Sequence, residues 1–169
     1  DVQSNGATLN NSRDNVLTQT GGWVQANPWL SGGAARVILN EVNSSNPSHL
    51  RGYVEVAGQK AEVIIANPAG IQINGGGFIN ADRVTLTTGT AVSNPVNGSL
   101  ESYRISQGMI SVDGLGLDTR GATYTDILAR SVQVNAGIWA NRLNVVTGAN
   151  EVTHGGLDNA ANVRQDIKP

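Results

Sequence analysis

Short segments in which apolar and polar residues alternate recur along the chain, and three of them share one pattern. Residues 71–75, 110–114 and 132–136 each read apolar, polar, apolar, Asx and small. Such a segment predicts a half-buried strand that ends in an Asx turn. The second and third copies start 22 residues apart, and the first and second start 39 residues apart. A longer pattern, which begins Ile-x-Ala-Asx-Arg and ends Thr-Gly, is shared by residues 79–89 and 138–148.

A repeat of this length in a chain poor in helix-forming residues indicates an all-β protein, a parallel β-helix, in which each strand pairs with its equivalent one coil further on. A leucine-rich repeat has a similar period, but its Leu-x-x-Leu-x-Leu frame is absent. A β-sandwich would have turns without equivalent strands recurring at fixed corners. Asparagine is expected at the corners of the coils. The equivalent apolar positions that are expected to point into the bore are Ile73, Val112 and Val134. The polar positions beside them, which are expected to face outward, are Gln72, Ser111 and Gln133.

The 39-residue spacing equals one coil plus an insertion, which we place at residues 90–106. Asn97-Gly98 favours a type I′ turn, so the insertion is expected to be an antiparallel hairpin outside the helix. The apolar residues expected on its returning strand are Leu100, Tyr103 and Ile105. Further strands are predicted at residues 35–42, 50–57 and 62–66, of which the last is apolar enough to be buried on both faces. The tail from His154 to Pro169 has little pattern.

Composition supports the all-β interpretation and excludes several kinds of functional site. Val and Ile together number 29 against 12 Leu, and β-branched residues favour strands. Cys is absent, which excludes a thiol nucleophile, a disulfide framework and a Cys-based zinc site. The net charge is −2, so there is no basic excess for nucleic-acid binding. The first residues do not resemble a signal peptide and lack Met; we interpret this start as a mature or trimmed end, which says nothing against secretion.

Candidate catalytic groups are few, and each has a simpler structural explanation. The acidic residues that could serve a polysaccharide-cleaving β-helix are Asp113, Asp118 and Asp126, with Arg120 and Arg130 nearby. Asp113 occupies the Asx position of the repeat, which predicts a corner residue. His49 and His154 are expected to be surface imidazoles. Gly75-Gly76-Gly77 lacks the Lys-Ser/Thr of a phosphate loop and predicts a tight corner. We therefore expect no catalytic site, no metal and no cofactor.

The three tryptophans allow two interpretations. Trp23, Trp29 and Trp139 could form a platform for stacking glycans, or they could be packing residues; packing is favoured. Trp139 stands at a polar position of the longer repeat, which indicates exposure.

Two Asn-Pro elements complete the set of motifs. One is Asn27-Pro28-Trp29-Leu30 and the other is Asn67-Pro68-Ala69-Gly70-Ile71. Each combines an Asx turn with a fixed φ and an apolar anchor. With the neighbouring stretches at residues 38–58, 77–80 and 86–89, they resemble the secretion domain of two-partner-secretion exoproteins. This family includes filamentous haemagglutinins, haemolysins and contact-dependent growth-inhibition proteins. Its motifs are Asn-Pro-Asn-Leu and Asn-Pro-Asn-Gly-Ile, from which this chain departs at Trp29 and Ala69.

The resemblance implies a right-handed parallel β-helix without enzymatic activity or cofactor. It implies a secretion module of a larger exoprotein of a Gram-negative bacterium. The POTRA domains of an outer-membrane β-barrel transporter would bind the module in the periplasm, and the unfolded chain would pass to the cell surface or medium. The two Asn-Pro motifs would be the recognised segments. The resemblance also implies that residues 1–169 form one domain that lacks part of the family's N-terminal cap and C-terminal end.

Two other functions remain open from the residues. The first is a surface adhesin module that binds host glycans or proteins through the hairpin near Asn97 and exposed tryptophans. The second is a carbohydrate-active β-helical enzyme, which the lack of an acid cluster disfavours.

Overall fold

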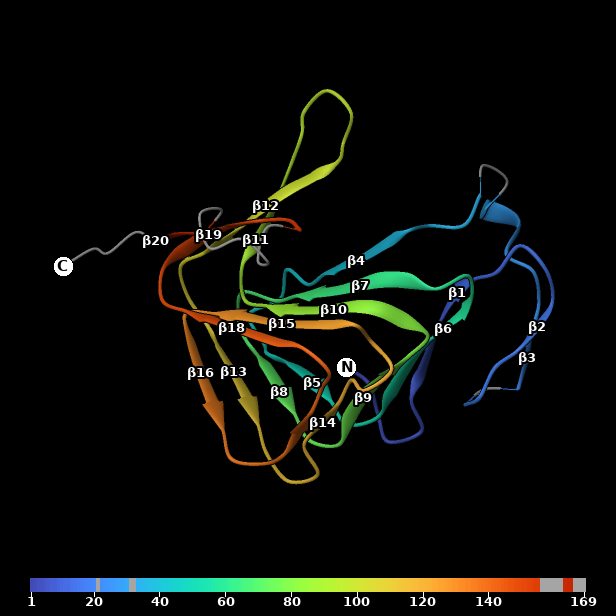
Figure 1. Cartoon of the computed structure of the whole chain (residues 1–169), viewed down its shortest axis with the longest axis horizontal. Helices are drawn as coiled ribbons and strands as arrows, with labels where there is room; N and C mark the ends of the chain where they lie inside the picture. Colours follow the sequence, from blue (N-terminus) through green and yellow to red (C-terminus); the bar gives the residue numbers. More distant parts are fainter. Residues whose placement is uncertain (21, 31–32, 156–162, 166–169) are drawn as a thin grey trace.

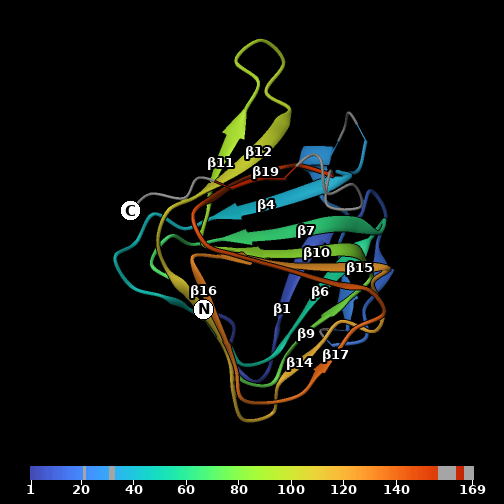
Figure 2. The same cartoon turned by 60° about the vertical axis from the view of Figure 1, so that its left-hand side comes forward.

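The structure is a computed structural model that describes residues 1–20, 22–30, 33–155 and 163–165. Three parallel sheets wind around a common bore and give the molecule the triangular outline seen end-on in Figure 2. The first sheet contains, in chain order, β4 (Val37–Glu41), β7 (Ala61–Ala66), β10 (Ala81–Thr87), β15 (Tyr124–Ala129) and β18 (Leu143–Thr147). The second sheet contains β5 (Ser48–Leu50), β8 (Ile71–Ile73), β13 (Met109–Val112) and β16 (Ser131–Val134). The third sheet contains β1 (Ala7–Asn11), β6 (Tyr53–Gly58), β9 (Gly76–Ile79), β14 (Leu117–Asp118) and β17 (Ile138–Trp139).

Successive coils stack in the register that the repeats predict. Ile110 pairs with Ile71 on one side and with Val132 on the other, and Val112 pairs with Ile73 and Val134. Along each of the three sheets, each strand after the first therefore pairs in parallel with the strand one coil before it, as in the β-helix expected from the sequence (Figure 1).

The predicted bore column is buried in the middle coils and exposed in the last one. Ile73 and Val112 are at most 1% exposed, whereas Val134 is 49% exposed. The expectation that Val134 is buried is wrong, because β16 is the end strand of the second sheet within the described residues and no further coil covers it. On the outer side, Gln72 and Gln133 are exposed as predicted, while the short side chain of Ser111 between them is 7% exposed.

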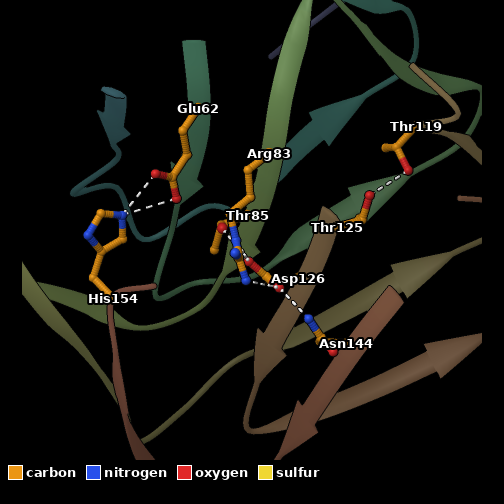
Figure 3. Close-up of polar contacts among 8 residues, drawn as sticks. All are labelled: Glu62, Arg83, Thr85, Thr119, Thr125, Asp126, Asn144 and His154. Atoms are coloured by element: carbon orange, nitrogen blue, oxygen red, sulfur yellow. Dashed lines mark hydrogen bonds and ion pairs between the residues drawn. The ribbon is translucent and has the colours of Figure 1, made fainter. Parts of the chain in front are cut away.

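A pair of threonines is buried among the apolar residues of the coils. Thr125 pairs with Val84 across the first sheet and is fully buried. Its hydroxyl donates to Oγ1 of buried Thr119 at 2.6 Å (Figure 3). The pair satisfies both hydroxyls where an unpaired one would cost stability.

Asparagine side chains occupy corners of the coils, as predicted. Nδ2 of Asn80 donates to the carbonyl oxygens of Val56 and Gly58 at 2.8 and 2.9 Å. Two coils later, Asn141 makes the same kind of pair of bonds, at 2.7 and 2.8 Å. Asn80 has a φ of +62°, which non-glycine residues rarely adopt and Asn tolerates best. The corner asparagines thus satisfy carbonyl groups where the chain leaves a sheet.

The predicted insertion is an antiparallel hairpin outside the helix, formed by β11 (Thr90–Ser93) and β12 (Leu100–Ile105). The prediction of a type I′ turn is wrong. That turn needs positive φ at both central residues, but Gly98 has φ +73° and Asn97 is not in that region. The loop instead spans residues 94–99, and the Gly98 amide donates to the Asn94 carbonyl at 2.8 Å.

The hairpin continues into a fourth sheet, called here the outer sheet, in the order β11-β12-β19-β20. It adds β19 (Asn150–Thr153) and β20 (Val163–Gln165) to the hairpin. The outer sheet covers the outer face of the first sheet, where Ile64 and Leu128 pack with Tyr103, Ile105 and Val152. This second core confirms that residues 62–66 are buried on both faces. Most of the weakly patterned tail lies outside the described residues.

The strand predicted at residues 50–57 is two strands. β5 ends at Leu50 and β6 begins at Tyr53, with a corner between them. A Cβ on Gly52 would lie 2.1 Å from the carbonyl oxygen of Gln3. The corner therefore needs glycine, which an alternating pattern does not reveal. A separate short hairpin, β2 (Val16–Leu17) and β3 (Trp23–Val24), lies beside the third sheet.

Candidate functional site

The second Asn-Pro motif forms the corner between β7 and β8. Asn67 is fully buried, and its Nδ2 donates to the Asn46 carbonyl at 3.0 Å and to the Ser48 hydroxyl at 2.9 Å. Its Oδ1 accepts the amide of Ala69 at 2.9 Å, which is the predicted Asx turn. The side chain thus joins two consecutive coils.

The other residues of this motif are also buried or half-buried in the corner, or have a backbone conformation that the corner requires. Gly70 has φ +120°, and a Cβ there would lie 2.7 Å from the Met109 carbonyl oxygen. Ile71 begins β8 and is fully buried, while Pro68 and Ala69 are half-buried. In the folded domain, the motif therefore offers little side-chain surface to a partner.

The first Asn-Pro motif uses the same turn but presents it to solvent. Oδ1 of Asn27 accepts the amide of Trp29 at 3.0 Å, and its Nδ2 donates to the Asn10 carbonyl at 3.0 Å. Pro28, Trp29 and Leu30 form the short 3₁₀ helix η1 (Pro28–Leu30). The Trp29 side chain is 89% exposed.

The structure does not bring the two motifs together. Asn27 is held next to the end of β1, because its amide donates to the Ser12 carbonyl at 2.8 Å. Near this end, the chain leaves β6 and enters β7, whereas Asn67 follows the far end of β7. The two motifs therefore lie near opposite ends of β7.

The preference for packing tryptophans is wrong for Trp23 and Trp29, which are 73% and 89% exposed. Trp139 is 49% exposed, as its polar repeat position indicates. The three do not form one platform, because Trp139 lies on β17 at one edge of the third sheet and Trp29 lies near β1 at the other. An aromatic residue in a turn-rich segment carries no signal that separates packing from exposure.

Asp126, one of the candidate acids, is a structural ion-pair partner. It is 2% exposed and accepts two bonds from Arg83, at 2.7 and 3.1 Å (Figure 3). Thr85 and Asn144 donate to the same carboxylate at 3.0 and 2.9 Å. The Arg83 guanidinium also lies 4.7 Å from the Tyr124 ring centroid. Four donors and full burial leave this carboxylate without access to a substrate.

Asp118 is held by two neighbours on the outer face of the third sheet. Arg120 Nε and Nη2 donate to its carboxylate at 3.1 and 3.0 Å, and the Tyr53 hydroxyl donates at 2.7 Å. The hydrogen bond from Arg120 is the largest cause that lowers the pKa of Asp118 to about 2. The same carboxylate raises the pKa of Tyr53. A carboxylate with so low a pKa is a poor general base or acid at neutral pH.

Asp113, the third candidate, is a corner residue as predicted, since its carboxylate accepts a bond from Asn135 one coil later at 2.9 Å. Gly75 also matches its prediction, with φ +77° at a corner. Among the described residues, no three His, Asp or Glu side chains come close enough to hold a metal. Nor does the described part of the chain contain a helix that could span a membrane.

The prediction that His154 is a surface imidazole is wrong. Its Nε2 lies 2.9 and 3.1 Å from the carboxylate oxygens of Glu62, and the side chain is 22% exposed (Figure 3). The hydrogen bond to Glu62 is the main cause that raises the pKa of His154. Burial raises the pKa of the neighbouring Tyr103. The pair joins residues 92 positions apart, a distance over which the sequence gives no signal.

The fold and these corners define a class of protein: a parallel β-helical domain with an extra-helical antiparallel hairpin. The model of the two-partner-secretion (TPS) secretion domain matches residues 1–168, and the chain belongs to this family. The crystal structure of the filamentous hemagglutinin secretion domain superposes with a TM-score of 0.87 at 32% identity, over 98% of this chain and 55% of that chain. This match confirms the right-handed parallel β-helix.

Two of the curated relatives are CdiA proteins. "Toxin CdiA" of Yersinia pestis is 59% identical over 152 residues, 90% of this chain. "tRNA nuclease CdiA-2" of Burkholderia pseudomallei (strain 1026b) is 50% identical over 159 residues, 94% of this chain. The chain spans 5% of the length of each relative, so the nuclease activity in the second name is stated of that protein alone. The matched region is a non-catalytic secretion domain of proteins that Gram-negative bacteria export through the outer membrane to the surface or medium.

Proposed function

We propose that this domain directs its exoprotein to an outer-membrane transporter, whose periplasmic POTRA domains recognise the two Asn-Pro motifs. The family supplies the secretion role, and the contrast in exposure between the motifs supports the assignment of residues. Trp29 is a large apolar side chain that the Asn27 turn holds in solvent. Exposed tryptophans at fixed positions are typical anchors of protein interfaces.

The motif from Asn67 to Ile71 would be recognised in a different state. Because Asn67 and Ile71 are fully buried in the folded domain, a partner can contact them only before the corner forms. This fits a transporter that accepts an unfolded chain. We therefore propose that POTRA domains contact the second motif in the extended chain and Trp29 in either state.

The test for Trp29 compares two exposed tryptophans. Trp29→Ala is expected to lower binding to immobilised POTRA domains and secretion of the exoprotein, while Trp23→Ala is the matched control outside the motifs. Equal binding and secretion by both variants would remove Trp29 from the recognition site.

The test for Asn67 must separate recognition from folding. Asn67→Ala removes three hydrogen bonds of a buried side chain and is expected to cost about 2–3 kcal/mol of unfolding free energy. Val112→Ala removes a similar amount of stability without touching the motif. Secretion of Asn67→Ala should fall well below that of Val112→Ala, and equal secretion would show that the motif acts only through stability.

A further inference from the structure

The outer face of the third sheet carries a row of residues that pair across four strands. Tyr53 on β6 pairs with Gly77 on β9, Gly77 pairs with Asp118 on β14, and Asp118 pairs with Trp139 on β17. Neighbouring strands lie about 4.8 Å apart, so the row extends about 14 Å along the stack of coils. It therefore begins and ends with an aromatic side chain and has a carboxylate between them.

Both aromatic rings lie against glycine. A Cβ on Gly77 would lie 2.4 Å from Cε2 of Tyr53 and 2.7 Å from two further ring carbons. A Cβ on Gly137 would lie 2.7 Å from Cη2 of Trp139, and one on Gly116 would lie 3.0 Å from its Cζ3. The glycines leave room for the rings to rest on the backbone. Since Tyr53 is 36% and Trp139 is 49% exposed, each ring keeps part of its surface in solvent.

A neutral polar pair lies between the rings. The bidentate contact of Arg120 with Asp118 and the bond from Tyr53 fix these groups in one orientation. The opposite charges of Asp118 and Arg120 cancel, and Glu55 and Lys60, which line the larger of the two hollows described next, are also of opposite charge. This surface therefore presents oriented donors and acceptors without net charge.

Two adjoining hollows of about 540 and 300 Å³ lie over this row, and Tyr53, Asp118 and Arg120 line both of them. We call the two hollows together the groove. Leu17 of the β2–β3 hairpin lines the larger hollow, and Leu115, 79% exposed, lines the smaller one.

The wall formed by the β2–β3 hairpin is fixed to the sheet. The carboxylate of Glu55, on β6, accepts the backbone amides of Gln19 and Thr20 at 2.8–2.9 Å. The larger hollow is therefore a built feature of the fold.

The geometry points to a neutral linear oligosaccharide as the ligand of this groove. Sugars combine apolar C–H faces, which stack on aromatic rings, with hydroxyls that both donate and accept hydrogen bonds. An extended peptide that adds a strand needs a free strand edge; both edges of β6, β9 and β14 are paired, so among the described strands of the row it could add only beyond β17, at the end of the row and not between its two aromatic rings. A phosphate or sulfated chain would need excess positive charge, which the Asp118–Arg120 pair does not supply. This binding activity goes beyond secretion and uses a surface separate from both Asn-Pro motifs.

The first experiment uses Trp139 as its own reporter. In the Trp23→Phe, Trp29→Phe double variant, Trp139 is the only tryptophan left. Its fluorescence is measured during titration with cellotetraose, chitotetraose and laminaritetraose, and with heparin tetrasaccharide for comparison. At least one neutral tetrasaccharide should shift the emission and protect Trp139 from iodide quenching. No response to any neutral sugar, or a response to heparin tetrasaccharide alone, would overturn the proposal.

The second experiment locates the contact by calorimetry with the sugar that binds. Tyr53→Ala and Trp139→Ala should each weaken binding about tenfold, because each removes one stacking surface. Trp29→Ala, which alters an exposed tryptophan outside the groove, should bind as the unaltered domain does. Unchanged affinity in both groove variants would refute the assignment. The quenching measurement does not use these variants and still decides the matter if one of them fails to fold.

Discussion

The same substitution at two positions of one bore column should have opposite outcomes. Val112 and Val134 are paired neighbours on β13 and β16, yet Val112 is fully buried and Val134 is 49% exposed. Val112→Asp places a carboxylate where it has neither water nor a partner, which costs several kcal/mol and should prevent folding. Val134→Asp leaves the carboxylate in contact with solvent, so the domain should fold and melt within a few degrees of the unaltered domain.

The milder substitutions Val112→Ala and Val134→Ala allow the loss of unfolding free energy to be estimated. Val112→Ala removes two methyl groups from a closed column, which costs about 2 kcal/mol including the unfilled space. In a domain of this size, that loss lowers Tm by about 4–8 °C. Val134→Ala should cost less than about 1 kcal/mol, because about half of that side chain is already in water.

The assay is thermal unfolding followed by far-UV circular dichroism. Purified variants should give sigmoidal melting curves, except Val112→Asp, which should show no cooperative transition. If Val134→Asp is as damaging as Val112→Asp, the end coil is more buried than the structure shows. If both Asp variants melt normally, the coil register is wrong.

Three further predictions concern polar groups. Asp126→Ala removes the carboxylate that accepts hydrogen bonds from Arg83, Thr85 and Asn144; unfolding free energy from thermal melts should fall by about 2–4 kcal/mol. The pKa of His154 is raised by Glu62, so their pairing stabilises the domain below about pH 6.5 and is lost as pH rises through the raised pKa. The fall in Tm from pH 6 to pH 9 should therefore be smaller in His154→Gln, and an identical fall would contradict the pairing. Asn80→Ala should cost more than Asn80→Gly by about 1 kcal/mol, because glycine adopts positive φ without strain; chemical denaturation measures the difference.

The coil register could be predicted because it depends on a local pattern. The pairs Ile71–Ile110 and Ile110–Val132 are equivalent positions of a repeat, and pairing in a β-helix joins equivalent positions. The exposure of Val134 could not be predicted, since it depends on whether another coil lies beyond β16. The corner at Gly52 was also missed, because an alternating pattern does not show that another segment passes within contact distance of the backbone.

The site was predicted less well, for a physical reason. The Asx turns at Asn27 and Asn67 each join residues only two positions apart, and both are present as expected. The Arg83–Asp126 pair connects different coils across the hairpin insertion, and a single sequence does not reveal such partners. The exposure of Trp29 depends on what the rest of the chain leaves uncovered, which only the folded arrangement decides.

The return of β19 onto β12 has a consequence for the order of folding. Most pairings between consecutive coils join residues 18 to 25 positions apart, as in Thr125–Leu143 and Val37–Glu62. The exceptions are the step that contains the hairpin and the β1–β6 pairing, in which Ala7 and Val54 are 47 positions apart. Beyond β6, a chain that folds from its first residues can therefore add coils one at a time. Two contacts have a longer range: β19 pairs with β12, and His154 bonds to Glu62. They join residues up to 92 positions apart, so they can form only after every intervening coil is present. Folding should then divide into many fast local steps and one slow final step. Protection from hydrogen exchange of the β12 amides that bond to β19, and not of those that bond to β11, would therefore report this last step.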